Sequence, residues 1–174
     1  YDSHYRKENE VRVAEELEHL SKKYKTKYFT FSDEAISPNA FNRMSKEILK
    51  RGVEMRSLGM LKFESSEKET PELFDDIYRA GFLMLFFGLE SANDRILSVI
   101  DKGCDQETER AVLKHSSEAG IWNHLYLFFG FPTEEREEAE DTIKFTIENS
   151  EVESGIIHSV GQSIFALEKD SAIY

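Results

Sequence analysis

The sequence has 174 residues, of which 40% are hydrophobic and 12% aromatic, so it can bury the core of one domain and is not expected to be disordered. Its 34 acidic and 22 basic residues give a formal net charge of -12, which disfavours nucleic acid as a partner because a polyanion would be repelled. The longest apolar run, residues 82–88, is too short to span a bilayer, and the single cysteine excludes an internal disulfide framework and indicates a cytoplasmic setting.

The first third of the chain alternates helical and strand patterns. Residues 8–23 carry apolar side chains at helical spacing and predict a helix, whereas the aromatic stretch 27–34 predicts a strand that ends in acids. Ser37 as the cap, Pro38 at the first helical position and Gly52 as the stop predict the next helix.

The middle of the chain repeats this order. Residues 53–65 predict a strand, and Thr70, Pro71 and Gly81 bound the helix that follows. The continuous apolar run 82–90 is typical of a strand that is covered on both faces.

The last third continues the alternation. Helical patterns over residues 93–100 and 105–119 precede a predicted strand over 121–132. The acidic segment 133–150 predicts a helix, and residues 154–168 predict the last strand. For the acidic helix we expect Thr133 as the cap and an apolar stripe formed by Ala139, Ile143 and Ile147.

The alternation predicts an α/β fold in which right-handed crossovers join parallel strands within a single domain, residues 1–174. The pattern fits either an open doubly wound sheet or part of a barrel. In both folds, chemistry gathers at the carboxyl ends of the strands. Unusual residues stand at three such ends, namely Asp33 with Glu34, Glu90 with Ser91, and residues 130–134.

Each of these groups also has a purely structural interpretation. Asp33 and Glu34 could be solvated loop acids, and Glu90 and Ser91 could simply precede a helix N-terminus, where negative charge is favourable. Residues 130–132 could form an ordinary turn between a strand and a helix. The recurrence of polar groups at successive strand ends favours a shared site.

Taken in order, five segments resemble the radical S-adenosylmethionine (radical SAM) enzymes, particularly the branch that is often fused to a cobalamin-binding domain. The segment FGLESANDRILSVIDKG, residues 87–103, is similar to the Gly-(Ile/Leu)-Glu-Ser strand end of that family and the helix after it. The other four segments are residues 12–24, 28–48, 60–81 and 128–145. The sequence departs from the family pattern at Lys62, where Arg is usual, at Thr133 and Glu135, and in the final FALEKDSAIY.

Members of this family hold a [4Fe–4S] cluster through three thiolates in a C-x3-C-x2-C loop after the first strand. Cys104 is the single cysteine and has no such partner, so we expect it not to be a ligand. The resemblance therefore implies strands two to six of a partial TIM-type (β/α)6 barrel of parallel strands, with the first strand and the cluster loop missing.

The resemblance also implies how S-adenosylmethionine (SAM) would be bound. Asp33 and Glu34 would accept hydrogen bonds from the methionyl ammonium, and Lys62 would face the carboxylate. The remaining expected cofactor-binding residues are Gly88, Glu90 and Ser91 for the ribose and the amino-acid end, and Gly130 and Pro132 for the adenine. Roles for Arg56 and Tyr126 inside the barrel stay open against core or outward-facing positions.

Other site chemistries lack their sequence patterns. The five histidines show no H-x-x-x-H or H-E-x-x-H spacing, so no zinc site is expected. His124 and His158 fall on predicted strands, where structural roles are favoured. No glycine-rich phosphate loop of the dinucleotide or Walker type is present.

Two functional interpretations follow. In the first, the parent protein is a radical SAM enzyme that begins with reductive cleavage of SAM and continues with hydrogen abstraction or methyl transfer on an unknown substrate. Cobalamin is then a candidate second cofactor. In the second, the chain is a scaffold or ligand-binding module without catalysis. In either case we expect the chain alone to be inactive toward SAM, and to self-associate through the open edge of the strand near Lys27.

Overall fold

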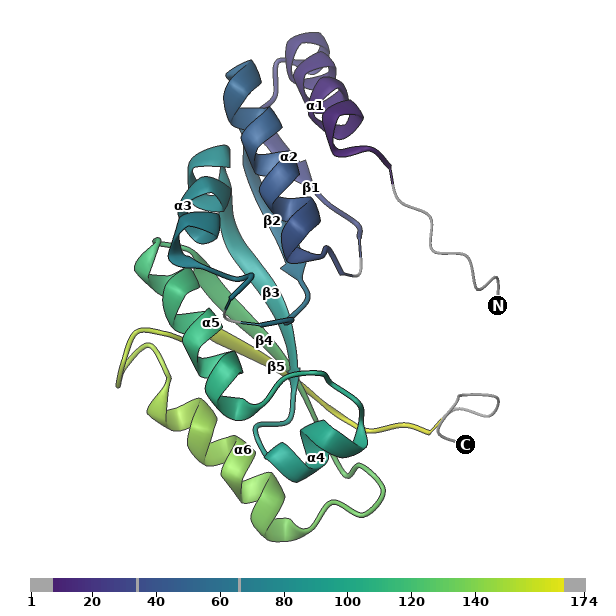
Figure 1. Ribbon diagram of the computed structural model, residues 1–174, viewed down its shortest axis with the longest axis vertical. Helices are drawn as coiled ribbons and strands as arrows, with labels where there is room; N and C mark the ends of the chain where they lie inside the picture. The colour runs from purple at the N-terminus through teal and green to yellow at the C-terminus, as the bar shows by residue number, and fades with distance from the viewer. Residues whose placement is uncertain (1–7, 34, 66, 168–174) are drawn as a thin grey trace.

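The computed structural model describes residues 8–33, 35–65 and 67–167, and within them strands alternate with helices except where two helices follow β3 (Figure 1). None of the helices in this described part is long and apolar enough to cross a membrane. The elements are α1 (Glu10–Tyr24), β1 (Tyr28–Thr30), α2 (Pro38–Arg51), β2 (Arg56–Leu61), α3 (Pro71–Ala80), β3 (Phe82–Glu90), α4 (Asp94–Val99), α5 (Gln106–Glu118), β4 (Trp122–Phe129), α6 (Arg136–Glu148) and β5 (Ser159–Ile164).

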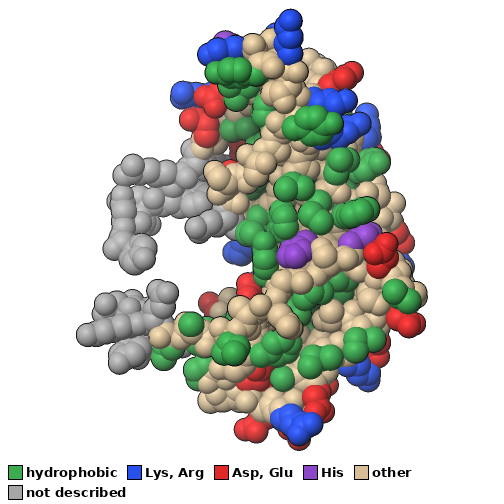
Figure 2. All heavy atoms as spheres, turned by 180° about the vertical axis from the view of Figure 1, so that it is seen from behind, with side chains coloured by type: hydrophobic (Ala, Val, Ile, Leu, Met, Phe, Trp, Pro, Cys, Tyr) green, Lys and Arg blue, Asp and Glu red, His purple; other side chains and the backbone are tan. Residues whose placement is uncertain are grey.

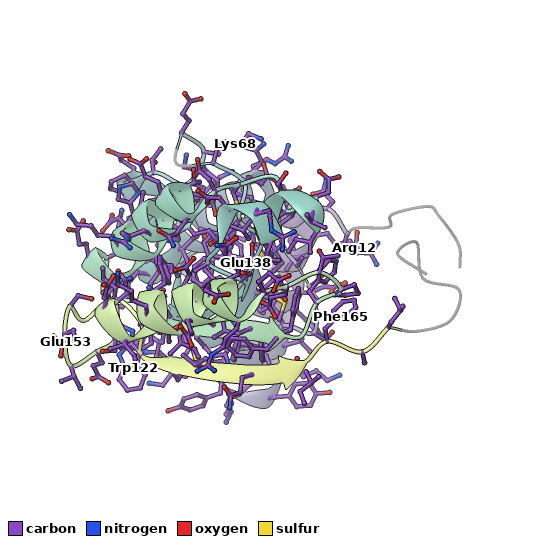
Figure 3. All side chains as sticks on the ribbon, turned by 90° about the horizontal axis from the view of Figure 1, so that it is seen from below. Arg12, Lys68, Trp122, Glu138, Glu153 and Phe165 are labelled. Atoms are coloured by element: carbon purple, nitrogen blue, oxygen red, sulfur yellow. The ribbon has the colours of Figure 1, made fainter. Side chains whose placement is uncertain are left out.

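The five strands form one parallel sheet in the order β1-β2-β3-β4-β5. A doubly wound sheet reverses its strand order at a switch point and carries helices on both faces. Here the order never reverses, and the helices lie on one side of the sheet (Figure 3). The sheet curls into a half-barrel, which confirms the partial TIM-type barrel and excludes the doubly wound alternative.

The predicted helix ends are confirmed where local capping sets them. The side chain of Ser37 accepts a hydrogen bond from the Ala40 N–H at the start of α2, and Gly52 ends that helix in the left-handed region at φ 64°. Thr70 and Gly81 do the same for α3, with Gly81 at φ 109°.

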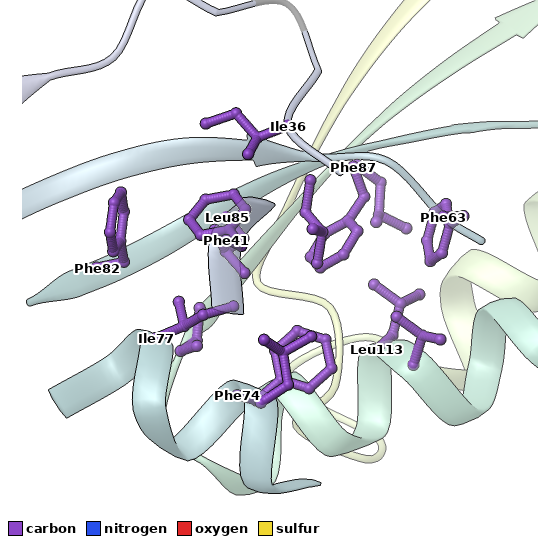
Figure 4. Close-up of a cluster of buried hydrophobic side chains, with 14 of the residues drawn as sticks. Ile36, Phe41, Phe63, Phe74, Ile77, Phe82, Leu85, Phe87 and Leu113 are labelled. Carbon is purple, nitrogen blue, oxygen red and sulfur yellow. The ribbon is translucent and has the colours of Figure 1, made fainter. Parts of the chain in front are cut away.

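The core lies between the sheet and the helices (Figure 4). Alternate residues of each central strand face the helices, as in Leu85 and Phe87 of β3, and they pack with helix residues such as Phe41, Phe74 and Leu113. Burial of these rings and branched side chains holds the helices to one side of the sheet.

The expectation that residues 82–90 are covered on both faces was wrong. Only one face of β3 is packed under helices, and on the other face Met84, Phe86 and Gly88 remain partly accessible. This second face is the inside of the half-barrel, which no helix of the described chain covers (Figure 3). The continuous apolar run therefore indicates that both faces of β3 are apolar, and it does not mean that helices cover both of them.

The expected cap and stripe of the acidic helix were also wrong. Glu135 is the residue that caps α6, through a reciprocal capping box with Glu138. The side chains of Ile143 and Ile147 are 48% and 59% exposed, so they do not form the buried face. The buried side chains of α6 include Thr142 and Phe145. Thr142 is buried because it makes hydrogen bonds with residues at the end of β3, which the apolar pattern of the sequence does not reveal.

Candidate functional site

Four of the predicted site residues lie at the carboxyl ends of neighbouring strands. Asp33 comes after β1, Lys62 directly follows β2, Glu90 ends β3, and Gly130 directly follows β4. Because all the strands are parallel and adjacent in sequence order, these ends meet at one rim of the half-barrel. Glu34 lies outside the described residues.

The end of β3 has an unusual backbone that positions the Glu90 carboxylate. Glu90 adopts the left-handed region at φ 66°, which is uncommon for a residue other than glycine, and the strand register shifts between Gly88 and Glu90. A Cβ at Gly88 would lie 2.5 Å from Glu90 Oε1. The missing side chain at Gly88 therefore leaves the space into which the carboxylate of Glu90 folds.

A lysine that we did not predict completes this feature. Lys102 Nζ lies 3.6 Å from Glu90 Oε1, and its side chain is only 17% exposed. The loop that carries it is held in place, since the Lys102 N–H donates to the Leu97 carbonyl and the Gln106 side chain donates to the Ala92 carbonyl. The Lys-Gly pair at residues 102 and 103 was visible in the sequence, but no local sequence pattern indicated that Lys102 lies against the end of β3.

The hydroxyl of Ser91 makes its hydrogen bonds to other residues of the protein interior. It is fully buried, lies 3.1 Å from Thr142 Oγ1 and accepts a hydrogen bond from the Asn93 N–H. The Ala92 N–H donates to the same Thr142 Oγ1. In this structure the Ser91 side chain thus fastens the tip of β3 to α6 and does not reach the accessible rim.

The turn after β4 requires glycine for its backbone conformation rather than for space. Gly130 has φ 81°, and a Cβ there would meet nothing nearer than Ile164 Cγ2, at 3.9 Å. The Gly130 N–H donates to the Glu134 carboxylate, and Pro132 is exposed. The open space beside Gly130 could admit a ligand, but it is the positive φ that requires glycine at this position.

Arg95 ties the same turn to two helices. Its guanidinium donates to both carboxylate oxygens of Glu138 and to the Thr133 carbonyl, so α4, α6 and the turn are held together. The hydrogen bond from Arg95 lowers the pKa of the Glu138 carboxyl to about 2. The ion pair therefore persists through the physiological pH range.

The inside of the half-barrel adjoins this rim. Asp33 lines a hollow of about 230 Å³ together with side chains that include Phe86 and Tyr126. Tyr126 thus faces the interior, which settles its position. Arg56 stands at the opposite end of β2, where it lines a separate hollow, and its guanidinium donates to the Met55 carbonyl.

Residues 1–146 match the family described as the radical SAM superfamily. The chain belongs to the radical SAM superfamily. Among curated proteins it is similar to an uncharacterized methyltransferase of Pyrococcus horikoshii, PH0819, with 29% identity over 136 residues. That alignment covers 77% of this chain and 29% of PH0819, so the chain spans less than a third of this relative.

Solved radical SAM enzymes share the fold. TsrM from Kitasatospora setae, a radical SAM methyltransferase solved with cobalamin and a [4Fe–4S] cluster, aligns with a TM-score of 0.73 at 18% identity, covering 91% of this chain and 29% of TsrM. The cobalamin-dependent enzyme OxsB aligns with a TM-score of 0.64 at 16% identity, covering 78% of this chain and 21% of OxsB. At these identities the likeness shows a common fold.

The described residues of this radical SAM chain do not fit a [4Fe–4S] cluster. Such a cluster needs several thiolates, and the sequence contains Cys104 alone. Burial, together with the neighbouring Glu109 carboxyl, raises the pKa of the Cys104 thiol to about 12, which disfavours the thiolate. The described chain also holds no group of three His, Cys, Asp or Glu side chains that could bind a metal ion.

The same rim does fit the charged end of SAM. Opposite charges stand at adjacent strand ends, with acids at Asp33 and Glu90 and bases at Lys62 and Lys102. A zwitterionic amino-acid group needs acceptors for its ammonium and donors for its carboxylate, and this rim supplies both kinds. The most specific feature of this rim is the missing side chain at Gly88, because any side chain at that position would displace the Glu90 carboxylate.

Proposed function

We propose that this chain is the SAM-binding portion of a radical SAM enzyme, and that the whole protein cleaves SAM reductively. The observation that carries this proposal is the Glu90–Lys102 pair above Gly88, at the carboxyl rim of a parallel half-barrel in a member of the superfamily. Left-handed backbone at a non-glycine residue is strained, and such strain is concentrated at functional sites.

In this proposal each rim residue has a defined task. Glu90 accepts hydrogen bonds from the ribose or the amino-acid end, and Asp33 accepts one from the methionyl ammonium. Lys62 neutralises the carboxylate as a point charge, without the bidentate geometry of an arginine. Gly130 and Pro132 shape the turn beside the adenine, and Ser91 acts through the backbone it holds rather than through its buried hydroxyl.

Methyl transfer is the reaction outcome we favour over hydrogen abstraction, with cobalamin as the second cofactor. Two similarities support this choice: PH0819 is named a methyltransferase, and TsrM is a methyltransferase solved with cobalamin. Because this chain spans only 29% of each of these proteins, the cobalamin and the cluster ligands would be held by parts outside this sequence. The isolated chain would accordingly not cleave SAM.

The experiment that tests this function uses the intact protein. After anaerobic reconstitution with iron and sulfide and reduction with dithionite, we expect consumption of SAM with 5′-deoxyadenosine as a product of reductive cleavage, and S-adenosylhomocysteine in addition where SAM donates a methyl group. Glu90→Gln should weaken SAM binding by about tenfold or more, since a charge-assisted hydrogen bond is lost. The control Glu151→Gln changes an exposed acid outside the rim and should bind SAM normally.

An intact protein that consumes no SAM after reconstitution would overturn the proposal. Retained SAM binding without consumption would favour the alternative, a ligand-binding module without catalysis. Unchanged SAM affinity in Glu90→Gln would remove Glu90 from the site while leaving the family assignment in place.

Lys102 is expected to position Glu90. In the intact protein, Lys102→Met should weaken SAM binding about threefold to tenfold, because the Glu90 carboxylate loses the charge that orients it. Lys102→Arg should largely restore binding, which a purely structural role for the lysine stem would not predict. Equal affinities for the Met and Arg variants, measured by calorimetry, would refute the positioning role; Lys144→Met is the control on an exposed helix face.

A further inference from the structure

We infer that the inside of the half-barrel, beside the SAM rim, binds the substrate as an uncharged planar ring that carries a hydrogen-bonding group. The inference rests on the proposed function and names the substrate class for that site. Its basis is a set of three rings on neighbouring strands, Phe86 of β3 with His124 and Tyr126 of β4.

The three rings are arranged around one another at contact distance. Phe86 and Tyr126 are nearly parallel, with 5.9 Å between ring centroids and an interplanar angle of 16°. His124 stands edge-on to both, at 5.1 Å from Phe86 and 4.8 Å from Tyr126. Aromatic rings prefer offset-stacked and edge-on partners, so another flat ring is the group that this arrangement recognises best.

Two glycines flank Tyr126 in the sheet. In the strand register Tyr126 is paired with Gly88 of β3 on one side and with Gly161 of β5 on the other. A Cβ at Gly161 would lie 3.1 Å from Tyr126 Cδ1 and 3.2 Å from His124 Nε2, so a side chain there would crowd both rings. The missing side chain at Gly161 thus gives room to the rings of Tyr126 and His124, as the missing side chain at Gly88 gives room to the Glu90 carboxylate.

The residues that line this hollow carry one formal charge, that of Asp33 at the rim, although the chain has 34 acids and 22 bases. Between Arg56 and Lys62, at the two ends of β2, the inward-facing residues described on the three central strands include Leu58, Met60, Met84, Phe86, Trp122, His124 and Tyr126. Figure 2 shows hydrophobic side chains gathered on this face, with histidine among them. An anionic ligand would lose its hydration here and would meet no basic side chain among the residues that line the hollow.

The imidazole of His124, in contact with the rings of Phe86 and Tyr126, supplies a hydrogen-bonding group on this face. His124 Nδ1 lies 2.7 Å from Ser159 Oγ, which fixes the imidazole and leaves Nε2 for a ligand. Burial lowers the pKa of His124, so the ring is neutral near pH 7 and offers a hydrogen bond without a charge. His158, by contrast, accepts from the Asn123 N–H and stacks on Trp122, so its role is structural.

The ring pocket is continuous with the cofactor rim. Asp33, a predicted SAM contact, lines the same hollow as Phe86 and Tyr126. Gly88, which makes room for the Glu90 carboxylate, is also the register partner of Tyr126. A ring bound here would therefore lie next to the proposed SAM site, as a substrate must.

The test is saturation-transfer NMR on the intact protein with three probes of similar size. Phenol is neutral and planar, cyclohexanol carries the same hydroxyl on a saturated ring, and benzoate is planar but charged. Phenol should bind about threefold to tenfold more tightly than either of the others, the difference expected from ring stacking and from the absence of a counter-charge.

Variants locate the binding. Tyr126→Leu and Gly161→Val should both abolish the phenol signal, whereas Tyr78→Leu should not, because Tyr78 is a similarly exposed tyrosine on the helix side (42% against 40%). Three results would overturn the inference. Phenol could still bind the Gly161→Val variant, cyclohexanol could bind as tightly as phenol, or phenol could fail to bind because another part of the polypeptide covers this face. In the wild type, SAM cleavage without phenol binding refutes only this inference, and phenol binding without SAM cleavage refutes only the proposed function.

Discussion

Gly81→Ala is expected to destabilise the fold by about 3 kcal/mol or more. Gly81 ends α3 at φ 109°, a conformation that a side chain strains. A Cβ there would overlap the Met55 carbonyl oxygen and would lie only 2.8 Å from its carbonyl carbon. The backbone cannot easily move away, because the Gly81 carbonyl accepts a hydrogen bond from the Ser57 N–H at the start of the sheet.

The chain offers a matched control in Gly52, which ends α2 in the same way. Gly52 has φ 64°, and a Cβ there would meet nothing within 4 Å. Gly52→Ala should therefore cost about 1 kcal/mol, the usual penalty for the left-handed region alone. Urea unfolding followed by circular dichroism measures both free energies, and similar losses for the two variants would show that the clash with Met55 is relieved.

Glu109→Gln is expected to stabilise the protein at alkaline pH. Burial raises the pKa of the Glu109 carboxyl to about 9, and one of its oxygens has no hydrogen-bond partner in the described structure. The unfolded chain releases this proton near the ordinary glutamate pKa of 4.5, whereas the folded chain keeps it. Between these values the folded state binds more protons, so its stability falls as the pH rises.

The glutamine variant carries no such proton and should escape this loss. We expect little difference from the wild type near pH 4.5 and a gain on the order of 3 kcal/mol at pH 8. Unfolding free energies measured across this range test the prediction, with Glu107→Gln as the control because Glu107 is exposed on the same helix. A gain that does not change with pH would contradict the buried-acid explanation.

The ends of α2 and α3 could be predicted from sequence because caps are local. The hydrogen bonds of Ser37 and Thr70 reach only three residues along the chain, and Gly52 and Gly81 adopt backbone conformations that their own neighbours require. The same local reasoning failed at Thr133, because the reciprocal bonds of Glu135 and Glu138 make a stronger start for α6 two residues later.

The residues of the candidate site likewise fall into those that could be predicted from the sequence and those that could not. Resemblance to the radical SAM family predicted acids and glycines at the strand ends, and the parallel sheet brings those ends to one rim. Sequence reasoning missed Lys102 and misjudged the hydroxyl of Ser91, whose partner Thr142 is 51 residues away. No local pattern reports contacts of that separation.

By itself, the sequence determined the order of helices and strands, most helix ends, the parallel crossovers and the family, because each depends on periodicity, caps or motifs within short segments. Only the tertiary structure decided between an open sheet and a half-barrel, since the sequential pairing of β1 to β5 is set by long-range packing. It alone placed Lys102 over Gly88 and gathered the rings of Phe86, His124 and Tyr126 inside the curve, because the register between strands is fixed only when the core under the helices closes.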